Sequence, residues 1–147
     1  MKIQLDNWKV INVNFESLKE KPREKNSFDL STGHFFPKEI DKSFGVGFEV
    51  EVKDKFFDLQ VEAIFMFKLD EDITEEFKLS NFPKINAPAI AFPFLRAYVS
   101  NLTLQSGFDP VILPSINFVQ FAKDKEEPYT HIISTKRRTS VIFVCLS

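Results

Sequence analysis

The chain has 147 residues, of which 44% are hydrophobic and 27% are charged, a composition typical of one soluble globular domain. Its formal net charge of −2 argues against a nucleic-acid partner, because phosphate binding requires a clustered cationic surface. A single cysteine, Cys145, and the lack of a signal-peptide or membrane-spanning stretch predict the cytoplasm, with no intramolecular disulfide and no membrane insertion.

Four extended segments are predicted from the alternation of apolar and polar residues, at residues 3–15, about 28–36, 44–52 and 57–69. In the first, one side carries Ile3, Leu5, Ile11, Val13 and Phe15, while Trp8 and Val10 interrupt the polar side. Residues 17–26 form a charged connection that is interpreted as a solvated loop, and residues 53–55 form a turn. The sequence therefore predicts an antiparallel sheet of four strands.

The last of these strands has apolar residues on both faces. Alternate positions from Phe57 to Phe67 are apolar, and the opposite face begins polar but turns apolar at Ile64 and Met66. A sheet covered on one face needs only one apolar face, so this second patch requires its own cover. A subunit interface, a bound peptide or a second local element would supply it.

One amphipathic helix follows, and Pro93 is expected in its first turn. Its apolar stripe is Leu95, Tyr98, Val99 and Leu102, and its remaining surface includes Arg96, Ser100, Asn101 and Thr103. Gly107 is expected to end the helix, before an apolar, proline-rich segment at residues 108–118. Strands followed by a helix indicate the α+β class.

No catalytic or metal-binding motif is recognisable. The sequence lacks a Walker loop, GxGxxG and HExxH, and neither His34 nor His131 has a carboxylate or nucleophile at a familiar spacing. Residues 70–76 are acidic but lack the EF-hand spacing, so a solvated loop is favoured over a cation site. We therefore expect no enzyme, no cofactor and no metal.

Phenylalanine is the unusual feature of the composition, with 18 Phe against two Tyr and one Trp. Phe offers a large apolar area without a polar group, which suits a core and a binding surface equally well. Most of these residues are expected in the core. The surplus is a candidate for an interface.

The helix and the segment after it resemble the bacterial protein-export chaperone SecB. The pieces that carry this resemblance are Phe92-Pro93-Phe94-Leu95-Arg96, Gly107-Phe108 and Leu113-Pro114-Ser115-Ile116-Asn117-Phe118. It covers about residues 3–118. It implies a single SecB-like domain over residues 1–147, with a four-stranded antiparallel sheet packed by a main helix and a divergent C-terminal segment at 119–147. The family continues there into a second helix and an acidic tail, whereas residues 119–125 allow at most a short helix.

The resemblance implies an ATP-independent chaperone that binds unfolded polypeptides or preproteins for export, as a homotetramer built as a dimer of dimers. Delivery to the SecA translocase motor is implied for the family, but the C-terminal region that this contact uses is replaced here. The residues expected to bind clients combine the apolar strand patch with the motif positions. They are Ile64, Met66, Phe92, Phe94, Phe108, Leu113, Ile116 and Phe118.

Two alternatives stay open. A SecB-like protein also serves as a dedicated adaptor for one partner, such as an antitoxin, and a non-catalytic structural oligomer would use its apolar surplus only to seal subunit contacts.

The C-terminal tail is the least family-like part of the sequence. Residues 138–146 are β-prone and lack proline, so we expect them to dock, either on a sheet edge or in the client groove. The added strand is the favoured prediction, beside a basic turn at residues 136–138.

Overall fold

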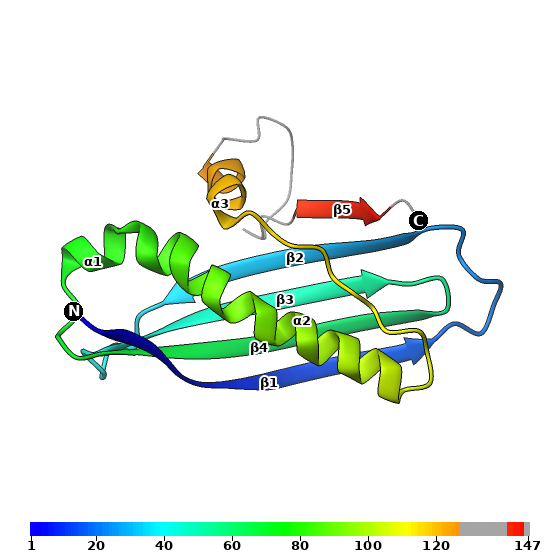
Figure 1. Cartoon of the computed structure of the whole chain (residues 1–147), viewed down its shortest axis with the longest axis horizontal. Coiled ribbons are helices and arrows are strands. Elements are labelled where there is room, and N and C mark those ends of the chain that lie inside the picture. Colours follow the sequence, from blue (N-terminus) through cyan, green and yellow to red (C-terminus); the bar gives the residue numbers. More distant parts are fainter. Residues whose placement is uncertain (127–140, 146–147) are drawn as a thin grey trace.

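A computed structural model describes residues 1–126 and 141–145. Five strands form one antiparallel sheet in the order β1-β4-β3-β2-β5 (Figure 1). Their bounds are β1 Ile3–Ser17, β2 Asn26–Phe35, β3 Ser43–Lys53, β4 Phe57–Leu69 and β5 Val141–Cys145. The α+β class and the four predicted strands are confirmed. The tail adds a fifth strand.

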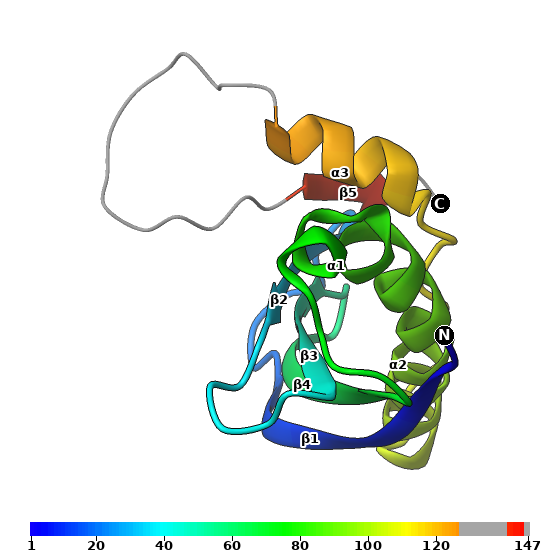
Figure 2. The same cartoon turned by 90° about the vertical axis from the view of Figure 1, so that its left-hand side faces the viewer.

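The helices lie on one side of this sheet. They are α1 (Glu75–Leu79), the π-helical turn η1 (Phe82–Asn86), α2 (Ala87–Gln105) and α3 (Phe118–Glu126). Helix α2 runs across one face, and the other face carries no helix among the described residues (Figure 2). None of the helices within residues 1–126 is long and apolar enough to cross a membrane.

Helix α2 begins earlier than predicted, at Ala87 instead of Pro93. Pro88 occupies its first turn, directly after the π-helical turn η1. Pro93 therefore lies inside the helix, where it removes one hydrogen bond to the carbonyl of Ala89. The early start buries apolar side chains that a later start would leave in a loop: Ala87, Pro88, Ala91 and Phe92.

The end of α2 is where the sequence predicts it. Gly107 has φ +93°, in the left-handed region that favours glycine. Its N–H donates to the carbonyl of Leu104 at 3.1 Å, and the N–H of Phe108 donates to that of Thr103 at 3.2 Å. This is the Schellman arrangement, which satisfies the last carbonyls of a helix.

In the middle of β1, the side chains that face the core are not the ones predicted from the sequence. Its pairing with β4 shifts between Leu5 and Asn7 and again between Val10 and Asn12, so the strand contains two irregularities of the β-bulge type. Each extra residue reverses which side chains face the core. Trp8 and Val10 consequently pack against the core, while Ile11, predicted to share that face, is 52% exposed.

The core lies between the sheet and α2. Strand β4 alternates strictly in burial, and β3 does so except at Gly45, which is buried on the outer face under Phe35. The predicted faces are confirmed, and the buried side chains are Phe44, Val46, Phe48, Val50, Val52, Phe57, Leu59, Val61, Ala63, Phe65, Phe67 and Leu69. Helix α3 closes one end through Phe118, whose ring lies 5.6 Å from that of Phe92 and 6.4 Å from that of Phe48.

The acidic connector at residues 70–76 is used structurally. The backbone N–H of Lys2 donates to Asp70 Oδ1 at 2.8 Å, and this bond lowers the pKa of the Asp70 carboxyl. Thr74 caps α1 by accepting from the N–H of Phe77 at 3.1 Å. Within the described ranges, no group of three or more His, Cys, Asp or Glu side chains gathers as a metal site.

The tail confirms the favoured prediction of an added strand. Strand β5 pairs antiparallel with residues 26–30 of β2, which are register partners of Cys145 through Val141. The predicted basic turn at residues 136–138 lies outside the described residues. Residues 119–125 form most of α3, so the short helix is confirmed.

Candidate functional site

A groove of about 770 Å³ opens at one end of the molecule, between the sheet and the segment that follows α2. One wall comes from the start of β2 and from the β3–β4 turn, and the other from residues 107–114. The apolar lining consists of Phe28, Val52, Phe56, Phe108, Pro110, Val111, Ile112, Leu113 and Pro114. Its polar lining is limited to a few groups: Asn26, Ser27, Asp54, Lys55 and Asp109.

The second wall is the segment 108–117, which we call the strap. Two side chains of α2 hold it. Arg96 Nε donates to the carbonyl of Leu113 at 2.9 Å, and the N–H of Val111 donates to Thr103 Oγ1 at 2.9 Å. Thr103 is fully buried, although its position predicted a place on the polar surface of the helix. Its hydroxyl donates toward the carbonyl of Val99 at 2.9 Å, so the same oxygen serves helix and strap.

Aromatic packing holds the first residue of the strap, Phe108, in place. The ring of Phe108 lies 4.8 Å from that of Phe57 and 5.6 Å from that of Phe15. Phe57 is fully buried, and its ring stacks on Phe15 at 4.9 Å. Offset and tilted ring pairs of this kind are favourable beyond their buried area. One side of Phe108 is thus part of the core while another side lines the groove.

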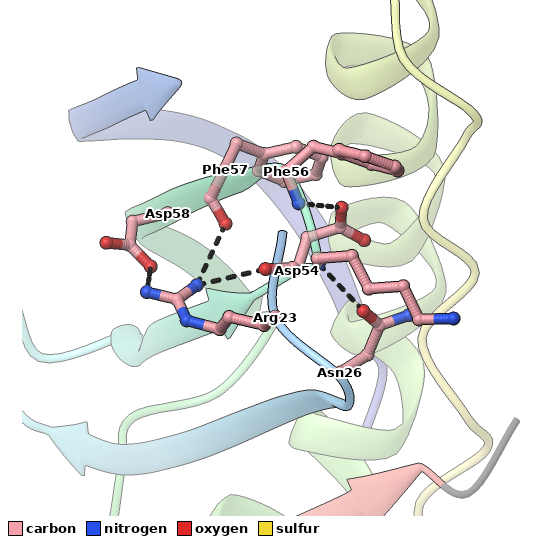
Figure 3. A network of polar contacts seen from close by, with 7 residues as sticks. Arg23, Asn26, Asp54, Phe56, Phe57 and Asp58 are labelled. Carbon is pink, nitrogen blue, oxygen red and sulfur yellow. Dashed lines mark hydrogen bonds and ion pairs between the residues drawn. The ribbon is translucent and has the colours of Figure 1, made fainter. Parts of the chain in front are cut away.

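A polar network holds the opposite wall (Figure 3). Arg23 lies in the loop after β1, and its Nη2 is 2.7 Å from Asp58 Oδ1. Its Nη1 donates to the carbonyls of Asp54 at 2.9 Å and Phe57 at 3.4 Å. Asn26 Oδ1 accepts from the N–H of Lys55 at 2.9 Å. The loop predicted to be merely solvated therefore fastens the β3–β4 turn.

This fastening presents an apolar side chain at the rim. The N–H of Phe56 donates to Asp54 Oδ2 at 3.0 Å, and its carbonyl accepts from the N–H of Leu18 at 2.8 Å. Although its backbone is hydrogen-bonded on both sides, Phe56 is 50% exposed. Across the groove, Ile112 is 74% exposed on the strap. Two large apolar side chains therefore stand at opposite rims.

The structure brings two of the eight predicted client-binding residues to this groove, Phe108 and Leu113. Phe108 is half-buried, and Leu113 is almost fully buried. Three others lie in or against the core: Phe92 and Phe118 are buried, and Ile116 is half-buried against their cluster.

The remaining three lie elsewhere. Phe94 is 46% exposed on α2, with its ring 6.4 Å from that of Trp8. Ile64 and Met66 are half-buried on the sheet face opposite α2. Their register partners on β3 are Gly47 and Gly45.

A side chain of the same sheet covers part of the apolar patch at Ile64 and Met66. The ring of Phe35 lies directly over Gly45, so closely that a Cβ there would overlap it. Because Gly45 pairs with Met66, the ring lies beside the apolar end of β4. A second local element thus shields some of this face.

Sequence reasoning missed Phe56, Ile112 and the two strap holders. A signal existed for the first two. Phe56 directly follows the predicted turn, and Ile112 lies between two prolines, where regular structure is disfavoured and apolar side chains stay accessible. Arg96 was marked only as part of the family motif, and nothing marked Thr103, because the partners of both are backbone atoms of the strap, outside their own helix.

The family model for SecB, the preprotein translocase subunit, matches residues 9–127. The chain belongs to the SecB family. The match extends through α3, so the SecB resemblance does not stop at Phe118 as predicted from the sequence. SecB-like chaperones form a non-catalytic family.

Two relatives illustrate how similar this chain is to other proteins in sequence. An uncharacterized protein of Methanocaldococcus jannaschii is 38% identical over 69 residues, which cover 47% of this chain and 43% of that protein. The SecB protein-export protein of Neisseria gonorrhoeae is 28% identical over 106 residues, which cover 60% of this chain and 71% of that protein. The chain thus spans less than half of the first relative.

A solved structure shares the SecB-like fold. It is a SecB-like chaperone of Mycobacterium tuberculosis in complex with a ChAD peptide from the HigA1 antitoxin. The two chains superpose with a TM-score of 0.61 at 17% sequence identity, over 78% of this chain and 89% of the other.

Proposed function

We propose that this SecB-family protein is an ATP-independent chaperone that holds unfolded polypeptide segments in the groove between the sheet and the strap. The observation that carries the proposal is the apolar groove with Phe56 and Ile112 exposed at its rims. Unfolded chains share no sequence, but they all expose apolar side chains. A broad apolar groove with few polar groups accepts many of them, and no reactive constellation is required.

We propose further that the protein works as an oligomer, with the tetramer of SecB as the expected state. Besides its buried stripe, α2 carries an outward row of Ile90, Phe94 and Leu104, which are 45%, 46% and 55% exposed. A helix that is apolar on both sides is normally covered on both. A second copy of the chain is the cover that a homo-oligomer provides. The cytoplasm remains the expected location.

The alternative is a dedicated adaptor for one partner. It is favoured by the similarity to the M. tuberculosis SecB-like chaperone, which was solved with an antitoxin peptide. Affinity purification distinguishes the two functions, because an adaptor retains one dominant protein and a general chaperone retains a spread of unfolded ones. A contact with SecA is left out of the proposal, because the C-terminal region that the family uses for it is replaced here by a segment that contains β5.

The test uses two variants with nearly equal exposure of the original side chain. Ile112→Asp places a charge at the groove rim, and Leu79→Asp places one on α1, where the leucine is 75% exposed. We expect Ile112→Asp to weaken binding of an unfolded client at least about fivefold, the factor equivalent to about 1 kcal/mol. Leu79→Asp should leave binding unchanged. Binding is measured by fluorescence anisotropy, and delay of client aggregation by light scattering without ATP.

Both variants should keep the melting temperature of the parent, because neither side chain is buried. Equal client affinity of the two variants would remove the groove from the proposal. In contrast, polar substitution of Phe108 is expected to lower both client binding and stability, because its ring also packs on Phe57 and Phe15.

A further inference from the structure

Strand β5 occupies the part of β2 that borders the groove. Figure 1 shows β5 beside β2. In its pairing with residues 26–30, Cys145 is opposite Asn26 and Phe143 is opposite Phe28. Asn26, Ser27 and Phe28 also line the groove. A polypeptide that leaves the groove on this side therefore meets the β2 edge where the chain's own C-terminal strand is already paired.

The sequence of β5 has the character of a client segment. Residues 141–145 read Val-Ile-Phe-Val-Cys, with no charge and no proline, and Val, Ile and Phe favour extended structure. Pairing to a sheet edge uses main-chain hydrogen bonds, which any extended segment can make. The strand has five residues against fifteen in β1, so few such bonds hold it.

We propose that β5 is an exchangeable strand: an extended apolar segment of a client displaces it from residues 26–30 of β2 and pairs there in its place. This inference rests on the proposed function. In it, the groove supplies apolar contacts and the β2 edge supplies main-chain hydrogen bonds to the same client. Clients long enough to reach both contacts are preferred over short ones.

The tail then sets the apparent affinity for clients. Because β5 belongs to the same chain, its docking is intramolecular, and tethered segments reach effective concentrations on the order of millimolar. When one part of a client is already bound in the groove, the neighbouring part of that client is also tethered and reaches a similarly high effective concentration at the β2 edge. If β5 is paired for nine-tenths of the time, it weakens client pairing at the edge by about tenfold.

A disulfide lock tests the exchange in the full-length chain. Asp29 and Ile142 are register partners, and Asp29 is not one of the residues that line the groove. Directly opposed antiparallel residues have Cα atoms roughly 4.5–5.5 Å apart, within the range of a disulfide. The variant is Asp29→Cys with Ile142→Cys in a Cys145→Ser background. The client is reduced and carboxymethylated α-lactalbumin, whose blocked cysteines take no part in disulfide exchange.

We expect the oxidised, locked protein to bind this client several-fold more weakly than the same protein after reduction. The Cys145→Ser parent should be indifferent to reductant. Truncation after Glu126 should have the opposite effect and tighten binding. If truncation also prevents folding, the comparison of the oxidised and reduced double-cysteine variant still tests the exchange.

Equal affinity of the locked and reduced forms overturns the exchange, and client binding by both then upholds the proposed function. If neither the wild type nor any variant binds the client, the proposed function and the exchange fall together.

Discussion

At the scale of single residues, Thr103 joins helix α2 to the strap through one hydroxyl group. It lies on α2, yet it is fully buried because the strap passes over it. Its oxygen accepts from the N–H of Val111 while its proton is directed to the carbonyl of Val99. A residue without a hydroxyl at this position would leave the Val111 N–H, which is partly buried, without this partner.

Replacing Thr103 by valine keeps the shape but removes that acceptor, so the free energy of unfolding should fall by ~1–3 kcal/mol. Thr103→Ser retains the hydroxyl and should lose less. Client affinity should follow the same order, because the strap that Thr103 holds is a wall of the groove. Urea denaturation and client titration of both variants measure this. A valine variant as stable as the serine one would show that the strap needs no anchor there.

At the scale of elements, the ring of Phe35 packs on the outer face of the sheet, at a position where the strand has a glycine, Gly45. A Cβ at Gly45 would overlap Phe35, whereas a Cβ at Gly47 would meet nothing within 4 Å. Two glycines of the same strand, both on the same face, thus have different roles. Gly45 is needed for close approach, while Gly47 is not.

The matched pair Gly45→Ala and Gly47→Ala tests this difference. The first should force Phe35, already 41% exposed, away from the sheet and lower stability by ~1–3 kcal/mol. The second should be neutral or stabilise by ~0.4–1 kcal/mol, because alanine restricts the unfolded chain. Thermal unfolding of both proteins compares them. Equal melting temperatures would mean that Phe35 contributes nothing where it lies.

Elements also show where sequence reasoning succeeds. Strands β3 and β4 were predictable because large apolar side chains recur at every second position along most of their length. Strand β1 was predictable in extent but not in face, because bulges add residues without leaving a distinctive local pattern. The start of α2 was placed too late because a proline inside a helix looks like a beginning when burial is unknown.

The candidate site was less predictable than the fold. Its motif residues are mostly core, as Phe92 and Phe118 show, because a family motif marks structure and binding alike. The rim residues Phe56 and Ile112 depend on how two distant loops face one another. Register and packing across the sheet decide that, and these do not follow from a local pattern.

At the scale of the whole molecule, the outward row of α2 predicts association. Leu104→Lys adds a charge to that row, and Ile40→Lys adds one to the β2–β3 connection, where the isoleucine is 51% exposed. We expect light scattering to show an oligomer for the parent and the Ile40 variant, and a smaller species for the Leu104 variant. A parent that is monomeric at micromolar concentration would contradict the expected oligomer.

The two irregularities in β1 have a consequence for the protein's own solubility. Strand β1 is the outermost strand on its side of the sheet, and it is long and partly apolar. A regular edge of that length is a template on which strands from other molecules stack without limit. Bulges interrupt the even spacing of its donors and acceptors, so only a short stretch can pair at a time. A chaperone of the proposed kind, which exposes apolar surface to unfolded chains, would thereby avoid pairing edge to edge with its own copies.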